Sequence, residues 1–479
     1  MPSCPPMPTL PPSPARRLTP LALTVLLLLG GAHAVPAVQG AWHGGFYRLT
    51  LTGLDARDGT VRWMPGGTGA DLKFSAALPT LTRTVPTAQD QIQIRVQDKD
   101  IQIRSAQGRP LRVNLTPVRA GVEGPTRFTA IDVYPEDAWT TYEPVPVTPC
   151  RAPAPAPELP YQPPAFASGP VGFYLAQIDP RTGTPLRVIA NDPDSLYPLA
   201  STFKQIVLWG TLRDVTAGRL TLNTRLSVTE ANRSIEAYQP GARTVQNLAT
   251  QAIVQSENTA SDVLHLRYGP DRLQTLVTAQ GACHTRVNTT TKAWWAAQAG
   301  LLQELYGPDV NTGAQQTFTL PPAEEAQTRA RAVQQTQTLN ADRLLDDLDR
   351  AFFSPTYHPQ TEVYLQNRST PREWATLLTR MYLDPSLNAT NRAFLRDTLA
   401  RGCCRAKDPG VAYWGSKAGS GWRNVTMSGL LSLTGGQTFV YAYFNPGSDV
   451  MDSLLIEEQL PDIARYVLEN AKRLARSTP

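Results

Sequence analysis

The pattern Ser-x-x-Lys, at Ser201 and Lys204, combines residue types and a spacing that could carry chemistry. A serine hydroxyl is a poor nucleophile until a base removes its proton, and a lysine serves as that base only when burial or nearby cations lower its pKa. Residues three apart share one face of a helix, so these two side chains can hydrogen-bond. The pair therefore predicts a nucleophilic serine in the first turn of a helix.

An isolated Ser-x-x-Lys is more often a helix cap followed by a solvated lysine. The composition argues against that interpretation, because the chain has only seven lysines beside 38 arginines. Where a solvated positive charge suffices, this sequence usually has arginine, which cannot be deprotonated, whereas lysine can act as a base. The lysine at position 204 therefore favours catalysis.

Two further stretches carry residue types that complete such chemistry. In Ser-Glu-Asn, Ser256 offers a second hydroxyl for proton relay, and Asn258 offers an amide that can hold a substrate carbonyl. Lys417 lies in Trp-Gly-Ser-Lys-Ala-Gly-Ser-Gly, where the glycines let a strand approach another backbone closely. A helix cap and a turn are the ordinary interpretations of each stretch alone, but in this order the three motifs form a set.

The elements around these motifs predict mixed α/β structure. Early strands, a long helical middle, late strands and a closing helix indicate one sheet built from both ends of the segment, with a helical lobe inserted. Strands are predicted at 173–178, 185–190, 425–433 and 438–444, and an amphipathic helix is predicted after Pro461.

The chain before and within this segment divides by composition. Residues 35–143 predict a β-rich accessory module, since apolar and polar residues alternate in it. Nine of the 21 residues from 144 to 164 are proline, so 144–168 predicts a semi-rigid linker that cannot pack a core. Residues 169–479 form the predicted hydrolase domain, in which about 285–367 is predicted to be a surface insertion.

The first 34 residues predict an export signal. Two arginines precede an apolar run at 21–29, and small residues ending at Ala34 follow it. No later run is apolar enough to span a bilayer, so we expect an exported, periplasmic or extracellular protein without a membrane span. A formal net charge of +5 is too small to argue for nucleic-acid binding.

Four cysteines follow the export signal, an even number that predicts two disulfides whose pairing stays open. A zinc site is the alternative, although the spacing lacks Cys-x-x-Cys and only His284 adjoins a cysteine. The four residues are Cys150, Cys283, Cys403 and Cys404.

The ordered motifs "STFK", "SENTASD", "STPREW" and "KAGSG" resemble those of class A β-lactamases within the penicillin-recognising serine hydrolases, which include DD-peptidases. The resemblance extends from about residue 169 to 477. It implies an α/β (α+β) fold of the β-lactamase/transpeptidase type, with an antiparallel sheet flanked by helices and an all-helical lobe. It also implies a small β-lactam or peptidoglycan-derived acyl substrate and no cofactor, and we expect a monomer.

The resemblance assigns a role to each motif residue. Ser201 would form the acyl-enzyme and Lys204 would help to deprotonate it. Ser256 would pass a proton to the leaving nitrogen, and Lys417 would stabilise a substrate carboxylate and tune Ser256. Substrate-binding positions would be Asn258, Gly419 and Ser420, with the backbone N–H groups of Ser201 and Ser420 forming the oxyanion hole.

Three departures from the family pattern stand out. Glu257 replaces an aspartate, and Ala418 replaces a threonine or serine hydroxyl for which Ser416 or Ser420 would have to compensate. The family's Glu-x-x-Leu-Asn, whose glutamate activates the deacylating water, has no clear counterpart. Glu362 is the nearest match, but it lies closer to the Thr-Pro helix than the family spacing allows.

Three functions therefore compete. The first is hydrolysis of β-lactams through an acyl-enzyme on Ser201, and the second is a DD-peptidase or esterase that uses the same serine. The third is a non-catalytic binding or scaffold protein, against which the complete set of proton-handling residues counts. A Ser-His-Asp hydrolase is disfavoured because no histidine lies in a recognisable motif, and His265 is predicted to be a core residue on an apolar helix face.

Overall fold

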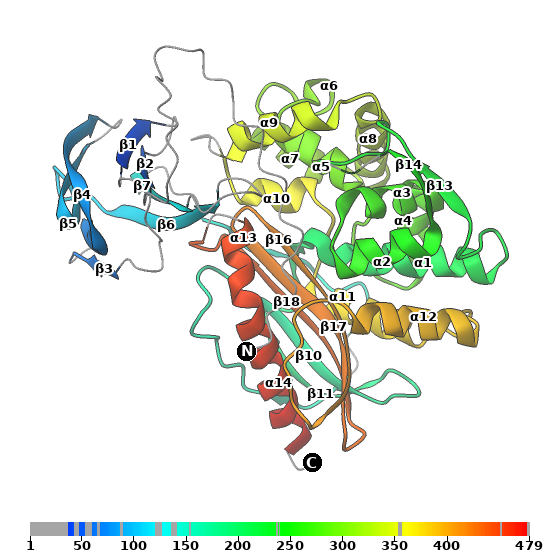
Figure 1. Ribbon diagram of the computed structural model, residues 1–479. Coiled ribbons are helices and arrows are strands. Elements are labelled where there is room, and N and C mark those ends of the chain that lie inside the picture. The colour runs from blue at the N-terminus through cyan, green and yellow to red at the C-terminus, as the bar shows by residue number, and fades with distance from the viewer. Residues whose placement is uncertain are drawn as a thin grey trace, which may run out of the picture. The chain divides into compact units, whose positions relative to one another are not determined.

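A computed structural model describes residues 37–42, 47–52, 60–64, 68–86, 90–119, 127–135, 141–152, 155–235, 238, 240–352, 357–450 and 453–476 (Figure 1). The predicted export signal lies outside the described residues. The chain divides into two compact units. The larger is built from Thr141–Leu348 and His358–Pro479, and the smaller comprises the described residues of Thr9–Thr140 and Asp349–Tyr357.

The smaller unit contains the predicted β-rich structure. The predicted alternation is confirmed, because Leu49 and Leu51 on one strand and Ile92, Ile94 and Val96 on another are all buried. One antiparallel sheet has the order β1-β2-β7-β6, and another has β3-β4-β5. The strands are β1 Ala37–Trp42, β2 Tyr47–Thr52, β3 Thr60–Trp63, β4 Gly69–Pro86, β5 Gln91–Ser105, β6 Leu111–Arg119 and β7 Arg127–Pro135.

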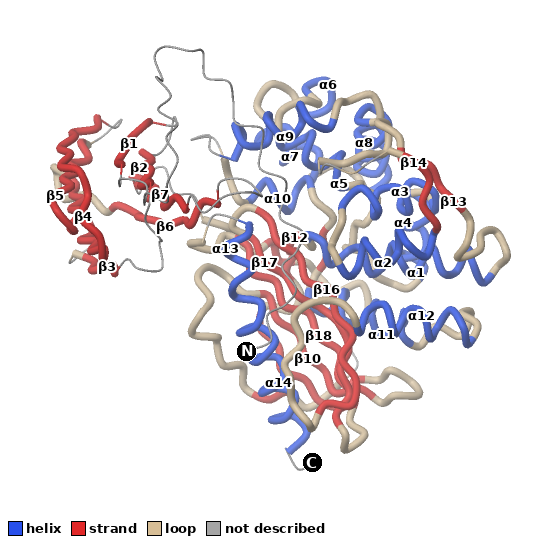
Figure 2. The backbone as a smooth tube through the Cα atoms, in the orientation of Figure 1, coloured by secondary structure: helices blue, strands red, loops and turns tan. Residues whose placement is uncertain are grey.

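The main sheet of the larger unit joins early and late strands, as the sequence predicts (Figure 2). Its order is β16-β17-β18-β10-β11-β9, and β10 pairs antiparallel with β18 so that Leu175 faces Tyr441. The strands are β9 Glu158–Leu159, β10 Gly172–Ile178, β11 Pro185–Asn191, β16 Val411–Gly421, β17 Asn424–Leu433 and β18 Thr438–Pro446.

Helices cover both faces of this sheet (Figure 1). The closing helix, α14 Leu460–Arg476, buries its apolar stripe with Phe173, Leu175 and Met427 in one cluster. On the other face, Trp374 of α11 Pro371–Tyr382 donates a 2.9 Å hydrogen bond to the hydroxyl of Ser428. Because successive strand residues point to opposite faces, Met427 faces the layer of α14 and Ser428 faces the layer of α11.

Most of the remaining helices form the predicted helical lobe, whereas α13 Ser453–Ile456 contacts β16 and β17 of the main sheet (Figure 1). A three-stranded sheet of order β15-β12-β8 adjoins the lobe. The helices are α1 Lys204–Thr216, α2 Val245–Val254, α3 Asn258–Tyr268, α4 Pro270–Ala279, α5 Thr291–Gln298, α6 Gln303–Tyr306, α7 Val310–Phe318, α8 Pro322–Thr336, α9 Ala341–Phe352, α10 Gln360–Leu365, α12 Ala389–Ala400 and α13 Ser453–Ile456. The short strands are β8 Val145–Pro146, β12 Ser195–Pro198, β13 Arg225–Val228, β14 Gly241–Thr244 and β15 Arg368–Ser369.

The predicted surface insertion contributes a buried ion cluster. Glu325 of α8 forms ion pairs with Arg286 at 3.1 Å, Arg329 at 2.9 Å and Arg368 at 2.6 Å. Burial opposes ionisation of Glu325, but the three arginines prevail and lower its pKa to about 2. The segment is therefore tied to strand β15 by buried charges.

The proline-rich segment, predicted to be a linker, packs along the larger unit. Its β8 pairs with β12 and its β9 pairs with β11, while Tyr161 and Phe166 pack against the apolar cluster beneath α14. A disulfide joins its Cys150 to Cys283 in the loop after α4. Composition alone predicted a spacer, but two aromatic rings and a covalent bond hold the segment on the domain.

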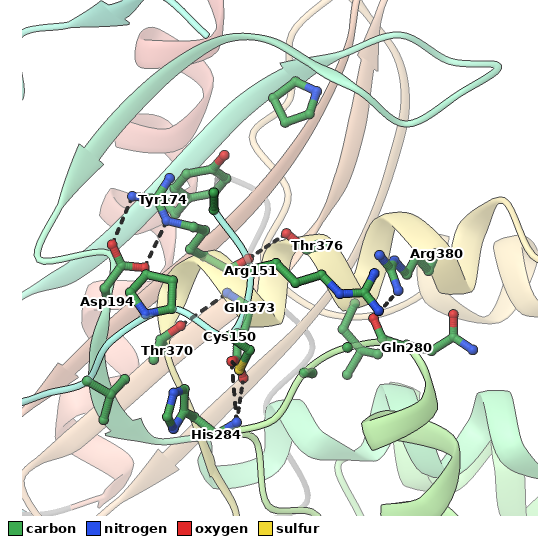
Figure 3. Close-up of a pocket in the computed structure, with 18 residues that line it drawn as sticks. Cys150, Arg151, Tyr174, Asp194, Gln280, His284, Thr370, Glu373, Thr376 and Arg380 are labelled. Atoms are coloured by element: carbon green, nitrogen blue, oxygen red, sulfur yellow. Dashed lines mark hydrogen bonds and ion pairs between the residues drawn. The ribbon is translucent and has the colours of Figure 1, made fainter. Parts of the chain in front are cut away.

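A pocket of about 240 Å³ lies where this segment meets the N-terminal part of α11 (Figure 3). His284 and Glu373 line it beside the disulfide, and together with the two cysteines they form a group of metal-ligand types within the described part of the chain. The sulfur atoms of Cys150 and Cys283 are bonded to each other in this structure. The other disulfide joins the adjacent residues Cys403 and Cys404.

None of the helices in the described ranges is long and apolar enough to cross a membrane.

Candidate active site

Ser201 lies in a short 3-10 turn, η4 Ala200–Phe203, that leads directly into α1. The N-cap residues are Leu199 for the turn and Phe203 for the helix, so Ser201 does not cap either element. Ala200 has a φ of +41°, a left-handed conformation that is uncommon outside glycine and that occurs at functional sites. The half-buried Ser201 thus follows an unusual backbone position at the start of a helix.

Lys204 is fully buried at the first residue of α1. Its side-chain nitrogen donates a 2.5 Å hydrogen bond to Oδ1 of Asn258, and it contacts Ser256 through both the backbone carbonyl and, at 3.4 Å, the hydroxyl. Burying a lysine requires such partners, because the charged form loses its water. The Ser-x-x-Lys and Ser-Glu-Asn motifs are therefore in direct contact.

Lys417 contacts the same hydroxyl from another element. It lies on β16, and its nitrogen donates a 2.7 Å hydrogen bond to Oγ of Ser256 and another to the carbonyl of Ala418. Burial and the nearby charge of Lys204 hold the pKa of Lys417 well below its ordinary value. The Ser256 hydroxyl thus bridges two buried lysine nitrogens.

Ser256 is positioned by the turn between α2 and α3. Its φ of +58° is left-handed, and the next residue, Glu257, is the N-cap of α3. The carboxylate of Glu257 accepts hydrogen bonds from the backbone N–H of Thr259 at 3.0 Å and of Ala260. Burial raises the pKa of Glu257. The glutamate that replaces the family's aspartate therefore still caps this helix.

Strand β16 presses against the backbone of Ser201 at Gly419. A Cβ on Gly419 would lie 2.4 Å from the backbone nitrogen of Ser201 and 2.9 Å from Cβ of Ala200. Opposite Gly419 in the sheet is Thr426, whose hydroxyl donates a 3.0 Å hydrogen bond to the carbonyl of Leu199. Only glycine permits this approach, as its sequence context predicts.

The residues that alternate with Lys417 and Gly419 on β16 have partners other than Ser256. Ala418 is buried in the apolar cluster beneath α14, so it brings no polar group to the strand. Ser416 donates a 3.0 Å hydrogen bond to the carbonyl of Cys403, and the Ser420 hydroxyl donates to the carboxylate of Glu457. The two hydroxyls expected to compensate for Ala418 thus both have protein partners.

Glu457 is a charged residue near these motifs that was not identified from the sequence. It begins a second 3-10 turn, η5 Glu457–Gln459, between α13 and α14. Its position shows no motif, and its contact with Ser420 joins residues 37 apart. Only the tertiary arrangement brings this carboxylate to the site.

The structure also shows the surroundings of Glu362 and His265, which were considered from the sequence. Glu362 lies buried in α10 and accepts a hydrogen bond from Gln366, and its role as a water-activating base stays a prediction. His265 is buried on α3 near the ring of Phe203, and burial lowers its pKa to about 3. The prediction of a core histidine is confirmed.

The arrangement provides the parts of an acyl-transfer site. It brings together Lys204, Ser256, Asn258 and Lys417 through hydrogen bonds, and it sets Gly419 against the amide of Ser201. The pocket in Figure 3 is lined by other residues, from the proline-rich segment, α11 and the loop after α4. The predicted catalytic residues therefore lie in the η4–α3–β16 cluster and do not line that pocket.

Comparison with known proteins points to one family. A model of the beta-lactamase enzyme family matches residues 165–469. No curated protein matches the chain.

Three solved structures illustrate the likeness. An ancestral class A β-lactamase is 20% identical, with 64% of this chain and 95% of that chain covered and a TM-score of 0.41. A β-lactamase from Chitinophaga pinensis is 14% identical, with 65% and 96% covered and a TM-score of 0.42. A PBP-A variant, solved as an acyl-enzyme complex with penicillin G, is 18% identical, with 63% and 90% covered and a TM-score of 0.39.

Proposed function

Because the chain belongs to the beta-lactamase enzyme family, we propose that it is a serine hydrolase in which β-lactams acylate Ser201 and water then releases the opened product. The observation that carries this proposal is the Ser256 hydroxyl, which is held between Lys204 and Lys417. A scaffold protein has no physical need for two buried lysines that share one serine, because each loses hydration on burial.

Acylation follows from the proton positions in this cluster. The Ser201 oxygen bonds to the substrate carbonyl carbon, and its proton passes to the neutral amine of Lys204. Burial and the charge of Lys204 lower the pKa of Lys417, so the two amines need not both be charged. In the proposed step Lys204 is the neutral amine while the one charge of the pair resides on Lys417. The backbone N–H groups of Ser201 and Ser420 stabilise the negative oxygen of the tetrahedral intermediate.

Collapse of that intermediate breaks the carbon–nitrogen bond. Ser256 gives its proton to the leaving nitrogen, and the lysine pair returns a proton to the Ser256 oxygen. Water then attacks the acyl-serine ester, which regenerates the Ser201 hydroxyl and liberates a carboxylic acid. Asn258, which already accepts a hydrogen bond from Lys204, is the proposed contact for the acyl side chain.

A peptidase or esterase that uses the same serine is the second candidate. Ala418 favours it, because this buried residue offers no hydroxyl to a β-lactam carboxylate. Deacylation separates the two functions, since a β-lactamase must release the acyl group quickly whereas a peptidase is trapped by it.

We also propose that the protein is exported. The basic and apolar pattern of residues 1–34 supports this, and so do two disulfides, which persist in oxidising compartments. Cell fractionation of the tagged full chain tests the proposal, and recovery of the uncleaved chain in the cytoplasm would overturn it.

Intact-protein mass spectrometry over time tests the enzymatic proposal. Benzylpenicillin and its methyl ester are added separately to the wild type and to Ser201→Ala. An adduct that forms on the wild type alone and then decays supports a hydrolase, whereas a lasting adduct assigns the chain to the peptidase alternative. Absence of any adduct with both compounds would overturn acylation at Ser201.

A further inference from the structure

A carboxylate of the protein itself lies at the end of strand β16. Glu457 is half-buried in η5, and its Oε1 accepts a hydrogen bond from the Ser420 hydroxyl. The preceding helix, α13, contacts β16 and β17, which places this turn beside the strand that carries Lys417 (Figure 1). Its negative charge acts on Lys417, whose pKa it raises against the effects of burial and of Lys204.

We infer that Glu457 is a specificity-determining residue. It disfavours a substrate carboxylate at the edge of β16 between Lys417 and Ser420, and it favours acyl donors that carry a neutral or positively charged group there. The inference rests on the proposed function, because it concerns the substrate of the acylation at Ser201. It narrows the preferred substrates to acyl donors without a carboxylate at this edge, such as β-lactams in which the carboxylate is esterified or amidated.

The first argument concerns hydrogen-bond donors. A serine hydroxyl has one proton to donate, and Ser420 donates its proton to Glu457. A substrate carboxylate is an acceptor only, so it gains nothing from this hydroxyl unless Glu457 first gives up its own bond. Ala418 supplies no replacement, since its side chain is buried among apolar groups.

The second argument concerns charge. A substrate carboxylate approaching Lys417 would meet the like charge of Glu457, which already compensates part of the lysine charge. Like charges at close range in a partly buried site repel more strongly than they do in bulk water. A neutral ester escapes this repulsion, and a cation is attracted.

The oxyanion hole is unaffected by this arrangement. The proposed oxyanion donor at position 420 is the backbone N–H, whereas Glu457 binds the side-chain hydroxyl. Glu457 therefore discriminates between substrates by the group they place at this edge, and it leaves the reacting carbonyl free to bind.

Two chemically matched probes test the inference on the full chain. Benzylpenicillin carries a carboxylate and its methyl ester does not, and in both the same β-lactam carbonyl acylates Ser201 while the rest of the opened molecule stays attached. The second-order rate constant for acylation of Ser201 is measured with each probe and corrected for the probe's intrinsic rate of alkaline hydrolysis. The readout is the ratio of the two constants in the wild type, Glu457→Gln and Glu458→Gln.

Glu458 provides the matched control, because it is the next residue on the same turn and its side chain is exposed. We expect the wild type and Glu458→Gln to prefer the ester. In Glu457→Gln the preference should fall by about ten-fold or more, through faster acylation by benzylpenicillin, as a like charge is removed. The glutamine has the shape of glutamate, and thermal denaturation confirms that each variant is folded.

Two outcomes would overturn the inference in distinguishable ways. If both probes acylate Ser201 but the ratio is the same in all three proteins, the role of Glu457 is wrong and the proposed function stands. If neither probe acylates Ser201 in any folded variant, the proposed function fails and the inference fails with it.

Discussion

The side-chain nitrogen of Lys417 donates a 2.7 Å hydrogen bond to the hydroxyl of Ser256. The same hydroxyl is 3.4 Å from the nitrogen of Lys204, so one oxygen links two buried amines. Protons can pass along such a chain without entering bulk water. Ser256 is therefore the residue on which the proposed proton path depends.

Replacing this hydroxyl should slow acylation and leave the fold intact. In Ser256→Ala the leaving nitrogen loses its proton donor, so we expect acylation by benzylpenicillin methyl ester to slow by about 10²–10⁴-fold, the usual contribution of a general acid. Time-resolved mass spectrometry measures the rate. Ser261→Ala, which removes a buried hydroxyl from the same region of α3, is the control. Equal acylation rates in the two variants would contradict the relay.

The contact between β16 and Ser201 gives a second prediction. Gly419→Ala puts a Cβ 2.4 Å from the Ser201 backbone nitrogen, so the strand or the turn must move. We expect about a 100-fold slower acylation, since a displacement of about 1 Å in a reacting group has effects of this size. Gly421→Ala is the control on the same strand, because its Cβ meets only Asn424 Cβ at 3.9 Å. Comparable losses in both variants would show that the tight contact is unimportant.

The buried ion cluster predicts a pH-dependent stability. In Glu325→Gln three arginines lose their common counter-charge, so we expect the free energy of unfolding to fall by about 3–5 kcal/mol, the usual cost of breaking a buried pair. Urea unfolding at pH 7 measures this difference. Glu324→Gln, which changes the exposed residue next to it, should have little effect.

The difference in unfolding free energy between the wild type and Glu325→Gln should also depend on pH. The reason is the pKa of Glu325, which is about 2 in the folded protein against an ordinary value of 4.5. A lowered carboxyl pKa stabilises the fold above the ordinary value, and the stabilisation is lost as the pH falls toward 2. The wild-type advantage over Glu325→Gln should therefore be constant above about pH 5 and shrink below it. A constant difference down to pH 3 would refute the assignment.

The motifs could be predicted from the sequence because their spacing is local. Ser201 and Lys204 share one turn, and Glu257 caps the helix that follows Ser256. Strands β10, β17 and β18 were also predictable, since their apolar runs are buried nearly throughout. The local periodicity of the sequence is enough to predict these elements.

Other features depend on tertiary proximity and could not be predicted. Four cysteines allow three pairings, and only the folded chain brings Cys150 to Cys283. The contact between Ser420 and Glu457 joins a strand end to a turn outside any motif. Proline content predicted a semi-rigid spacer at 144–168, but it gave no information on where Tyr161 and Phe166 would pack.

The position of β10 between β11 and β18 has a consequence for biosynthesis. During translation one edge of β10 can pair early with its hairpin partner β11. The other edge pairs with β18, which is synthesised near the C-terminus. Until translation is almost complete, that edge presents unpaired backbone groups to other chains. The hydrolase unit must therefore finish folding after release from the ribosome, and truncation before residue 438 should leave an aggregation-prone nascent chain rather than a smaller enzyme.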